Sequence, residues 1–376
     1  MKFYVLSNEW NAFLDKAASV IPTKSYNPLV SRVYVTAEGN QLTGHASDCS
    51  NYLQVSAPAQ VYDPGAFAVD AEDIALFSRI PSGHGVMITV DAGKITARSD
   101  SGKTITVAAC QYDDFAEIPG GVSALETCGT FPAAWIAETV KKLRKFTMSS
   151  ESNKMMQSVN FNFGLCRAEA LDGHRFTFRS FPDSVPSGSV HVMLPAAVAD
   201  SVLSSVVEKN SSGSVTISRG ENFSFLSGGS WVLASRCEFP HYFDTARLFP
   251  SGYDFELTTT SKDFAKVLKE YNDFCKKPKD AAVFPCILSR SGSGFTVSAR
   301  NARAEMSDEI SAAVVSGSVP EDYRIGYNPG YMLDACQVSG SPDFSVQFGS
   351  AKQPIVFVSA DFSGLILPVN IASVPR

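Results

Sequence analysis

The chain of 376 residues carries a formal net charge of −6, and 44% of its residues are hydrophobic while 19% are charged. This length is too great for one ordinary hydrophobic core and suits two or three domains, and the composition excludes a disordered protein. The acidic balance argues against a protein that simply coats nucleic acid. No apolar run approaches the roughly 18 residues of a membrane span, and the first residues lack the apolar core of a signal peptide, so we expect a soluble, cytoplasmic protein.

Three amphipathic helices are predicted at regular intervals along the chain. In the first, apolar residues stand at positions 10, 13, 14, 17 and 21, which form one face of a helix. Similar patterns cover residues 136–143 and 264–275, and each pattern follows a short strand-like run. The starts lie roughly 125 residues apart, which is the size of a whole domain rather than of a solenoid repeat.

The second half of each unit repeats as well. Strand-like runs at 67–70, 190–194 and 323–327 each lead into a helical pattern, and further strands follow. Joints rich in Gly, Pro or Ser lie near 120–124 and 250–252. Such halves pack helices in one layer and sheets in another, and several in series can close a ring with helices on one wall and sheets on the other. We therefore predict an α+β chain in which each domain has two β-α-β-β-β halves, with domains at 1–122, 123–252 and 253–376.

A hairpin is predicted near the middle of the chain, where Asp172-Gly173 separates strand-like runs at 161–166 and 175–179. Asp-Gly favours a type I′ turn, which needs positive φ at both central residues. His174 and Asp172 also suggest an acid–base pair, and His174 with a cysteine suggests a nucleophilic dyad. Residues i and i+2 across a tight turn need not face each other and no third orienting group is visible, so catalysis is the weaker interpretation.

The cysteines are dispersed along the chain, with no CxxC motif, and the five histidines are equally scattered. Metal sites and disulfide frameworks both need clustered spacing. We therefore expect reduced and mostly buried thiols, no metal ion and no cofactor. The cysteines are Cys49, Cys110, Cys128, Cys166, Cys237, Cys275, Cys286 and Cys336.

Positive charge is concentrated on two of the predicted helices. Residues 131–145 carry four cations against one carboxylate, and residues 261–279 carry six lysines against three carboxylates. Lys262, Lys266 and Lys269 lie at i, i+4 and i+7, which places them on one stripe of a helix. A solvated helix face is the simplest interpretation of one such stripe. Two stripes at equivalent places in an acidic protein indicate phosphate contacts, which bind DNA without reading its sequence.

Four segments, spread in order over the chain, resemble the bacterial DNA polymerase III beta subunit, the sliding clamp. Residues 171–176 (LDGHRF) resemble the family's segment in its middle domain, and 239–242 (FPHY) resemble its Phe-Pro-x-Tyr corner. Residues 325–334 (IGYNPGYMLD) are similar to the entry into its last helix, and 365–371 (LILPVNI) to its C-terminal strand and turn.

The resemblance implies a non-catalytic processivity factor. In that family two chains of three domains close head-to-tail into a ring around duplex DNA, with helices on the inside. A groove between the middle and last domains takes short peptides from the DNA polymerase III catalytic subunit and the clamp loader. The resemblance also implies a homodimer contact between the region near Phe274 and the first domain of the partner chain. Neither a cofactor nor a membrane is implied.

The implied site residues form two sets. The groove would be lined by Val159, Leu171, Gly173, His174, Arg175, Phe176, Pro240, Leu248, Ser345, Leu365, Ile366, Leu367, Pro368 and Val369. DNA would be contacted by Lys24, Arg79, Lys141, Lys142, Arg144, Lys145, Lys154, Lys262, Lys266 and Lys269.

This sequence departs from the family at two groove positions. Leu171 stands where the family usually has threonine or serine, and Asn370 stands where arginine is common. These departures leave open a clamp-like paralogue, from a mobile element or with a specialised role, that keeps the fold but serves other partners.

Overall fold

The computed structural model describes residues 1–119, 121, 125–149, 153–182, 190–207, 212–237, 239, 241–275, 284–292, 294–301, 304–310, 312–340 and 344–371. It divides into two compact units. Unit 1 consists of residues 1–140 and 192–240, and unit 2 consists of residues 141–191 and 241–376. The three-domain division remains a prediction.

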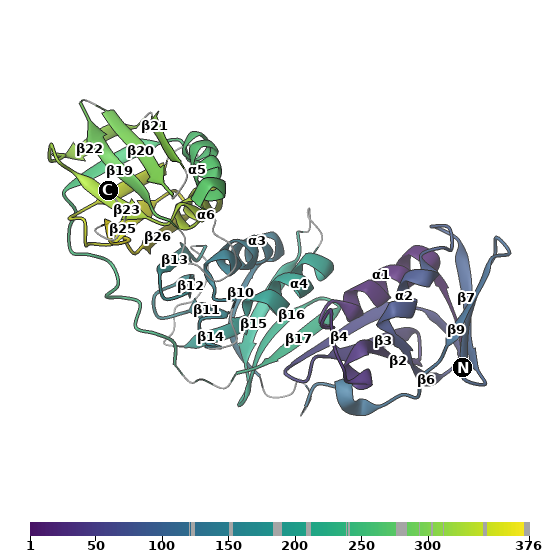
Figure 1. Cartoon of the computed structure of the whole chain (residues 1–376). Helices are drawn as coiled ribbons and strands as arrows, with labels where there is room; N and C mark the ends of the chain where they lie inside the picture. Colours follow the sequence, from purple (N-terminus) through teal and green to yellow (C-terminus); the bar gives the residue numbers. More distant parts are fainter. Residues whose placement is uncertain are drawn as a thin grey trace. The chain divides into compact units, whose positions relative to one another are not determined.

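A module of one strand, one helix and three strands recurs six times along the chain (Figure 1), which confirms the predicted α+β class and the repeated halves. Strands β5 and β22 are additions to this order. The helices are α1 (Ser7–Ala18), α2 (Ala71–Phe77), α3 (Ala133–Leu143), α4 (Ala196–Val206), α5 (Ser261–Cys275) and α6 (Pro329–Ser339), and β14 (His191–Pro195) precedes α4. Short 3-10 turns are η1 (Pro28–Ser31), η2 (Asp114–Ala116) and η3 (Arg144–Phe146).

Unit 1 is built on two antiparallel sheets, in the orders β5-β1-β7-β8-β9 and β10-β15-β16-β17-β4-β3-β2-β6. Helix α1 packs on β2, β3 and β4 and contacts α2 and α4 at its sides (Figure 1). The strands are β1 (Lys2–Leu6), β2 (Arg32–Glu38), β3 (Gln41–Ser47), β4 (Asn51–Pro58), β5 (Gln60–Asp63), β6 (Gly65–Asp70), β7 (Gly85–Asp91), β8 (Lys94–Ser99), β9 (Thr104–Ala108), β10 (Glu126–Pro132), β15 (Ser214–Arg219), β16 (Phe223–Gly228) and β17 (Trp231–Arg236).

Helix α1 confirms the predicted apolar face over most of its length. Trp10, Phe13 and Leu14 are buried, and the indole of Trp10 packs edge-on against Phe3 of β1. The helix ends at Ala18, so Ile21 lies beyond it and is only half-buried. The early end has a local reason, because the following Pro22 disfavours helical backbone at Ile21.

Unit 2 contains the strand order β11-β12-β13-β26-β25-β24-β18-β22 and a second sheet, β21-β20-β19-β23. Helices α5 and α6 pack against each other, and α6 contacts β26 (Figure 1). The strands are β11 (Ser158–Asn162), β12 (Arg167–Leu171), β13 (Arg175–Ser180), β18 (Phe255–Thr259), β19 (Cys286–Ser291), β20 (Gly294–Arg300), β21 (Glu305–Ile310), β22 (Ala313–Gly317), β23 (Arg324–Tyr327), β24 (Phe344–Phe348), β25 (Ile355–Val358) and β26 (Phe362–Ile366).

Each unit is joined by one antiparallel pair of strands that are far apart in the sequence. In unit 1, β4 pairs with β17 and Tyr52 lies opposite Ala234. In unit 2, β13 pairs with β26 and Phe176 lies opposite Leu365. In both cases the third strand of one module pairs with the third strand of another. Modules from distant parts of the chain therefore share one continuous sheet.

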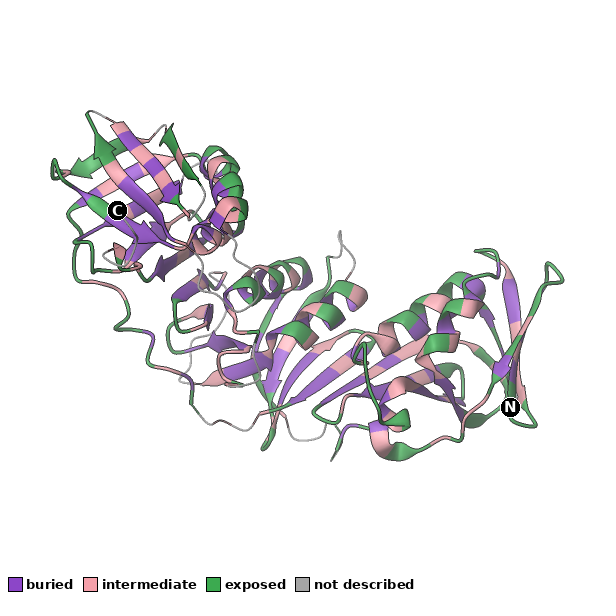
Figure 2. Cartoon of the chain, viewed as in Figure 1, coloured by how far each residue is buried: buried purple, intermediate pink, exposed green. Residues whose placement is uncertain are grey.

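Helix α5 separates its buried and exposed faces cleanly (Figure 2). Phe264, Leu268 and Tyr271 are buried, and the Tyr271 hydroxyl donates to the Val297 carbonyl at 2.8 Å and to Asp308 Oδ2 at 2.9 Å. These contacts tie α5 to the β20–β21 hairpin.

The described cysteines are free thiols, but only Cys275, Cys286 and Cys336 are buried, so the prediction of mostly buried thiols is wrong. Cys275 and Cys286 are both buried, with their Sγ atoms 4.0 Å apart. In the described part of the chain, no helix is both long enough and apolar enough to span a membrane.

Acidification is expected to destabilise unit 1 through His45 in β3. Burial lowers the pKa of this imidazole, which is only 8% exposed. A depressed pKa in the folded state gives stability that is present above the unfolded value of about 6.5 and is lost as the pH falls through the folded value. His45→Gln should therefore lose less stability than the wild type between pH 7 and pH 5, as measured by urea unfolding. Equal losses in the two proteins would contradict this assignment.

Candidate functional site

The hairpin turn at Asp172-Gly173 is the centre of the candidate site, and it differs from the predicted type. Gly173 adopts φ +88°, but Asp172 does not adopt a positive φ, so the turn is not type I′. Instead Asp172 Oδ1 accepts hydrogen bonds from the backbone N–H groups of His174 at 3.0 Å and Arg175 at 3.1 Å. An aspartate at this place can hold the turn with its own side chain, and that made the type I′ prediction wrong. The hairpin itself is confirmed by the pairing of β12 with β13.

An apolar row crosses three neighbouring strands at this turn. Leu171 lies opposite Phe176, and Phe176 lies opposite Leu365, so the three side chains share one face of the sheet. The ring of Phe249 packs edge-on against Phe176 with centroids 5.9 Å apart. Leu367, just beyond β26, is 41% exposed. Leu171, Phe176 and Leu365 are themselves buried, so the row is a packed apolar layer that ends at an accessible leucine.

The predicted groove residues do not all lie on this face. Val159 is fully buried on the opposite face, in the row of Ala170 and Thr177. Ser345 lies on the same face as Phe176 but in the neighbouring row, opposite Val358. Pro240 lies outside the described residues.

The C-terminal residues of the candidate groove are fixed by backbone bonds. The Leu367 N–H donates to the His174 carbonyl at 2.9 Å, and the Val369 N–H donates to Gly326 at 2.7 Å. Ile366 is fully buried, Pro368 is half-buried, and Leu248 is 37% exposed.

Arg175 is the hub of a charged network beside this apolar row, although it is adjacent to Phe176 in β13 and therefore lies on the opposite face of the strand. Its guanidinium donates to Asp172 Oδ2 at 2.8 Å, to Asp334 Oδ2 at 2.6 Å and to the carbonyl of Lys145. It also lies 4.3 Å above the ring of Tyr331. With only 9% of the residue exposed, Arg175 connects the turn, η3 and α6.

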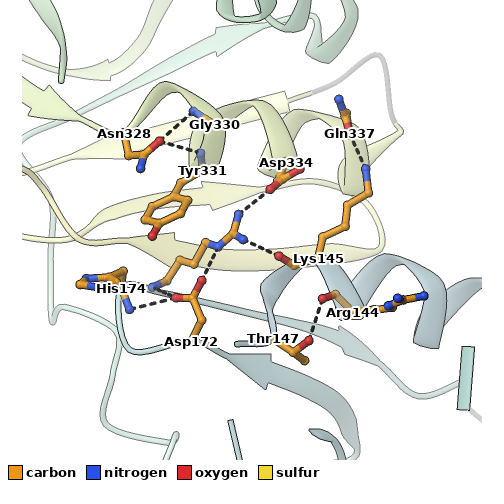
Figure 3. A network of polar contacts seen from close by, with 11 residues as sticks. Arg144, Lys145, Thr147, Asp172, His174, Asn328, Gly330, Tyr331, Asp334 and Gln337 are labelled. Atoms are coloured by element: carbon orange, nitrogen blue, oxygen red, sulfur yellow. Dashed lines mark hydrogen bonds and ion pairs between the residues drawn. The ribbon is translucent and has the colours of Figure 1, made fainter. Parts of the chain in front are cut away.

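His174 stacks on Tyr331, the third residue of α6, with ring centroids 6.1 Å apart (Figure 3). Burial raises the pKa of the Tyr331 phenol and Asp172 raises it further, so the phenol is neutral at physiological pH. The helix start is fixed by Asn328, whose side chain accepts from the backbone N–H of Gly330 at 2.9 Å. The carboxylate of Asp172 is occupied by backbone N–H groups and Arg175, which removes the basis for an acid–base pair with His174.

A buried polar cluster anchors the segment that carries Leu248 and Phe249. Glu169 of β12 has a fully buried side chain and accepts from Thr245 Oγ1 at 2.7 Å and from Arg167 at 2.8 Å. Asn160 and Asn162 also donate to this carboxylate. Asn160, Asn162 and Arg167 lie on the sheet itself, whereas Thr245 lies in the 241–249 segment. The Glu169 carboxylate therefore binds this segment to the sheet.

Three residues at this site were not among the predicted site residues: Tyr331, Asn328 and Phe249. Asn328-Pro329 is a helix-start signal in the sequence. Tyr331 follows in the first turn of that helix, so this signal could have indicated it as a candidate site residue. Phe249 was not predicted because it lies directly before 250–252, the stretch interpreted as a joint.

The predicted DNA-contacting residues fall into two groups. Lys262, Lys266 and Lys269 form an exposed stripe on α5, as their spacing indicated. Lys142 instead lies over the Phe362 ring at 4.9 Å, and Lys145 donates to the Gln337 side chain of α6. Lys145 is nevertheless exposed, as are the remaining members: Lys24, Arg79, Lys141, Arg144 and Lys154.

Comparison with known proteins gives a consistent picture, although no protein-family model matches the chain. A beta sliding clamp of Staphylococcus epidermidis is 22% identical over 406 aligned residues, covering 98% of this chain and 99% of that protein. A putative DNA polymerase III beta subunit of Eubacterium rectale superposes with a TM-score of 0.87 at 20% identity, over 99% of this chain and 100% of that one. The DnaN sliding clamp of Pseudomonas aeruginosa bound to griselimycin gives a TM-score of 0.86 at 19% identity, with the same coverage. From end to end, then, this chain has the DNA clamp fold and is similar to the bacterial beta sliding clamp, the DNA polymerase III beta subunit.

Proposed function

We propose that the protein is a DNA polymerase processivity clamp, a cytoplasmic ring of two chains that encircles duplex DNA and tethers its partners without catalysing a reaction. The observation that carries this proposal is the match in fold and sequence over the whole chain to beta sliding clamps. Retention by a closed ring is topological, so the DNA contacts need only be weak and screened by salt.

The unpaired sheet edges support closure by a second copy. Of the six modules, the third strands β4 and β17 pair in unit 1, and β13 and β26 pair in unit 2. Within the residues that the structure describes, the third strands left without such a partner are β9 and β21, which stand at the edges of their sheets. In the two observed pairs, the first module of one predicted domain meets the second module of another. The same rule joins β21 of one chain to β9 of its partner, and two such contacts close a symmetric dimer.

The backbone hydrogen bonds show which residues of β9 and β21 direct their N–H and C=O groups towards the edge of the sheet. The Ser99 N–H donates to the Lys103 carbonyl and the Ala109 N–H to Gly93, so alternate residues of β9 bond to β8. The pairing register leaves Thr104, Thr106 and Ala108 facing the free edge. On β21, the bond from Asn301 N–H to the Ala304 carbonyl sets the same alternation and leaves Glu305, Ser307 and Glu309 facing outward.

The exposed charges at the two edges are of opposite sign. Glu305 and Glu309 are exposed on β21, whereas Lys103 and Arg98 are exposed beside β9. Opposite charges at facing edges favour this pairing and disfavour pairing of like edges. Phe274 is half-exposed on α5, and α5 packs against β20, the strand that pairs with β21. This position suits the predicted contact with the partner's first domain.

The channel and the peptide site complete the proposal. Lys262, Lys266 and Lys269 on α5, with Lys141 and Arg144 near the end of α3, would contact phosphates. The apolar row of Leu171, Phe176 and Leu365, continued by exposed Leu367, would take hydrophobic anchors of a short peptide from the polymerase or the clamp loader. Each buried leucine or phenylalanine anchor contributes about 1.5–3 kcal/mol, so two or three support micromolar binding.

Retention on DNA tests the function directly. After loading by a cognate clamp loader, the protein should stay on circular duplex in high salt and slide off linear duplex of the same sequence. Blocking both ends of the linear DNA with bound protein should restore retention. Equal, salt-sensitive loss from both forms, in a protein shown to load, would mean ordinary electrostatic binding and would refute the clamp.

A further inference from the structure

We propose that Asp334 is a positioning residue of the peptide site: through Arg175 it holds the His174–Tyr331 pair in place, although it does not line the site itself. Asp334 Oδ2 accepts from Arg175 Nη1 at 2.6 Å, and its side chain is 28% exposed. This inference rests on the proposed function, because it concerns the groove that would bind a partner peptide.

The geometry of α6 places the three relevant side chains on one face. Tyr331, Asp334 and Gln337 are spaced three residues apart, and they meet His174, Arg175 and Lys145 respectively (Figure 3). Arg175 fills the space between them, since its guanidinium lies 4.3 Å above Tyr331 and bonds to both aspartates. The orientation of His174 relative to α6 therefore depends on the Arg175–Asp334 ion pair.

The same turn occurs at residues 48–51 without such an arginine, which shows that the turn does not need it. Asp48 Oδ1 accepts from the N–H groups of Ser50 at 2.9 Å and Asn51 at 2.7 Å, as Asp172 does for its own turn.

Asn51 stands where Arg175 stands, at the start of its strand, and its side-chain amide bonds back to Asp48 at 2.8 Å. The turn is thus complete with local bonds alone. The additional ion pair between Arg175 and Asp334 instead connects the turn to α6, where His174 stacks on Tyr331.

The test uses the full-length dimer and griselimycin, the compound bound to the P. aeruginosa clamp. Asp334→Asn should weaken griselimycin binding about tenfold by titration calorimetry, the effect of losing one charge-assisted hydrogen bond. Asp334→Glu, which keeps the carboxylate, should recover most of the affinity. The matched control is Asp361→Asn, which removes the 3.1 Å partner of Arg179 on the same strand and should leave affinity unchanged.

Two measurements separate positioning from general stabilisation. In a His174→Ala background, Asp334→Asn should lower the griselimycin affinity less than twofold, because the side chain that Asp334 is proposed to position is absent. In histidine-labelled protein, the ring-proton resonance of His174 should move in Asp334→Asn towards its position in Tyr331→Ala, and should stay in place in Asp361→Asn.

Each outcome decides the question. An undiminished loss in the His174→Ala background, a His174 resonance that stays in place, or equal loss of the dimer in Asp334→Asn and Asp334→Glu would each overturn the proposal. Wild-type protein that binds no griselimycin would count against the proposed peptide site alone. The His174 resonance would then still support or refute the positioning role.

Discussion

Replacing Arg175 with alanine is expected to lower the free energy of unfolding by about 3 to 5 kcal/mol and to abolish peptide binding. Arg175 is 9% exposed and bonds to two aspartates and the Lys145 carbonyl. Removing one partner of a buried pair leaves the other charges uncompensated, and this accounts for the size of the effect. Here Asp172 and Asp334 would both lose their cation. Differential scanning calorimetry gives the stability change, and griselimycin titration gives the affinity.

The control is Arg247→Ala, which removes an arginine that is 90% exposed and lies 3.8 Å from Asp244 in the neighbouring segment. A surface ion pair of this kind contributes at most about 1 kcal/mol, so neither stability nor affinity should change measurably. His174→Ala should reduce affinity while keeping the stability of the wild type, because the ring is exposed and the Leu367 bond uses only its backbone carbonyl. An Arg175→Ala protein as stable as Arg247→Ala would contradict the role of the hub.

Replacing Thr106 with proline is expected to dissociate the dimer while each chain stays folded. The backbone N–H of Thr106 faces the free edge of β9, so proline removes a donor that β8 does not use. The loss of this bond and the unsatisfied acceptor on β21 of the partner would cost about 1–3 kcal/mol at each contact. A symmetric ring has two such contacts, so the dissociation constant should rise by roughly 30-fold or more. Sedimentation equilibrium measures it.

Thr106→Val keeps the N–H group and changes only the side chain, so it should dimerise like the wild type. The proline variant should also fall off circular DNA, because an open ring has no topological hold. A dimer that persists in Thr106→Pro would show that β9 is not the contact, and it would leave the fold assignment standing. The complementary variant Ser307→Pro on β21 should behave in the same way.

Local patterns in the sequence predicted the modules well. Helix α1 and helix α5 emerged from the spacing of their apolar residues, because a helix that covers a sheet must repeat its apolar side every third or fourth residue. The hairpin at Asp172-Gly173 was predicted for a similar reason. Its turn type was not, because Asp172 can satisfy the turn either with backbone dihedrals or with its own carboxylate, and residue identity does not distinguish the two.

The assembly of the site could not be predicted from periodicity. Asp334 and Arg175 are 159 residues apart, and nothing near either residue indicates the other. The registers of the paired strands from β11 to β24 set which faces Val159, Ser345 and Phe176 occupy, and a shift of one residue would move a strand's side chains to the other face. The family resemblance supplied most of the site, but it did not separate Lys142 and Lys145, which contact Phe362 and Gln337, from the exposed lysines of α5.

The pairing of β4 with β17 also has a consequence for how the protein is made. During synthesis the edge of β4 emerges from the ribosome about 180 residues before its partner, and at about 5–20 residues per second this leaves it uncovered for roughly 10 to 35 s. The edge of β13 stays uncovered for about the same time before β26 is synthesised. An open strand edge can pair with another nascent chain, so neighbouring ribosomes on one message would present matching edges to each other. Slow translation between β4 and β17 would lengthen this exposure, and we expect it to increase aggregation rather than to improve folding.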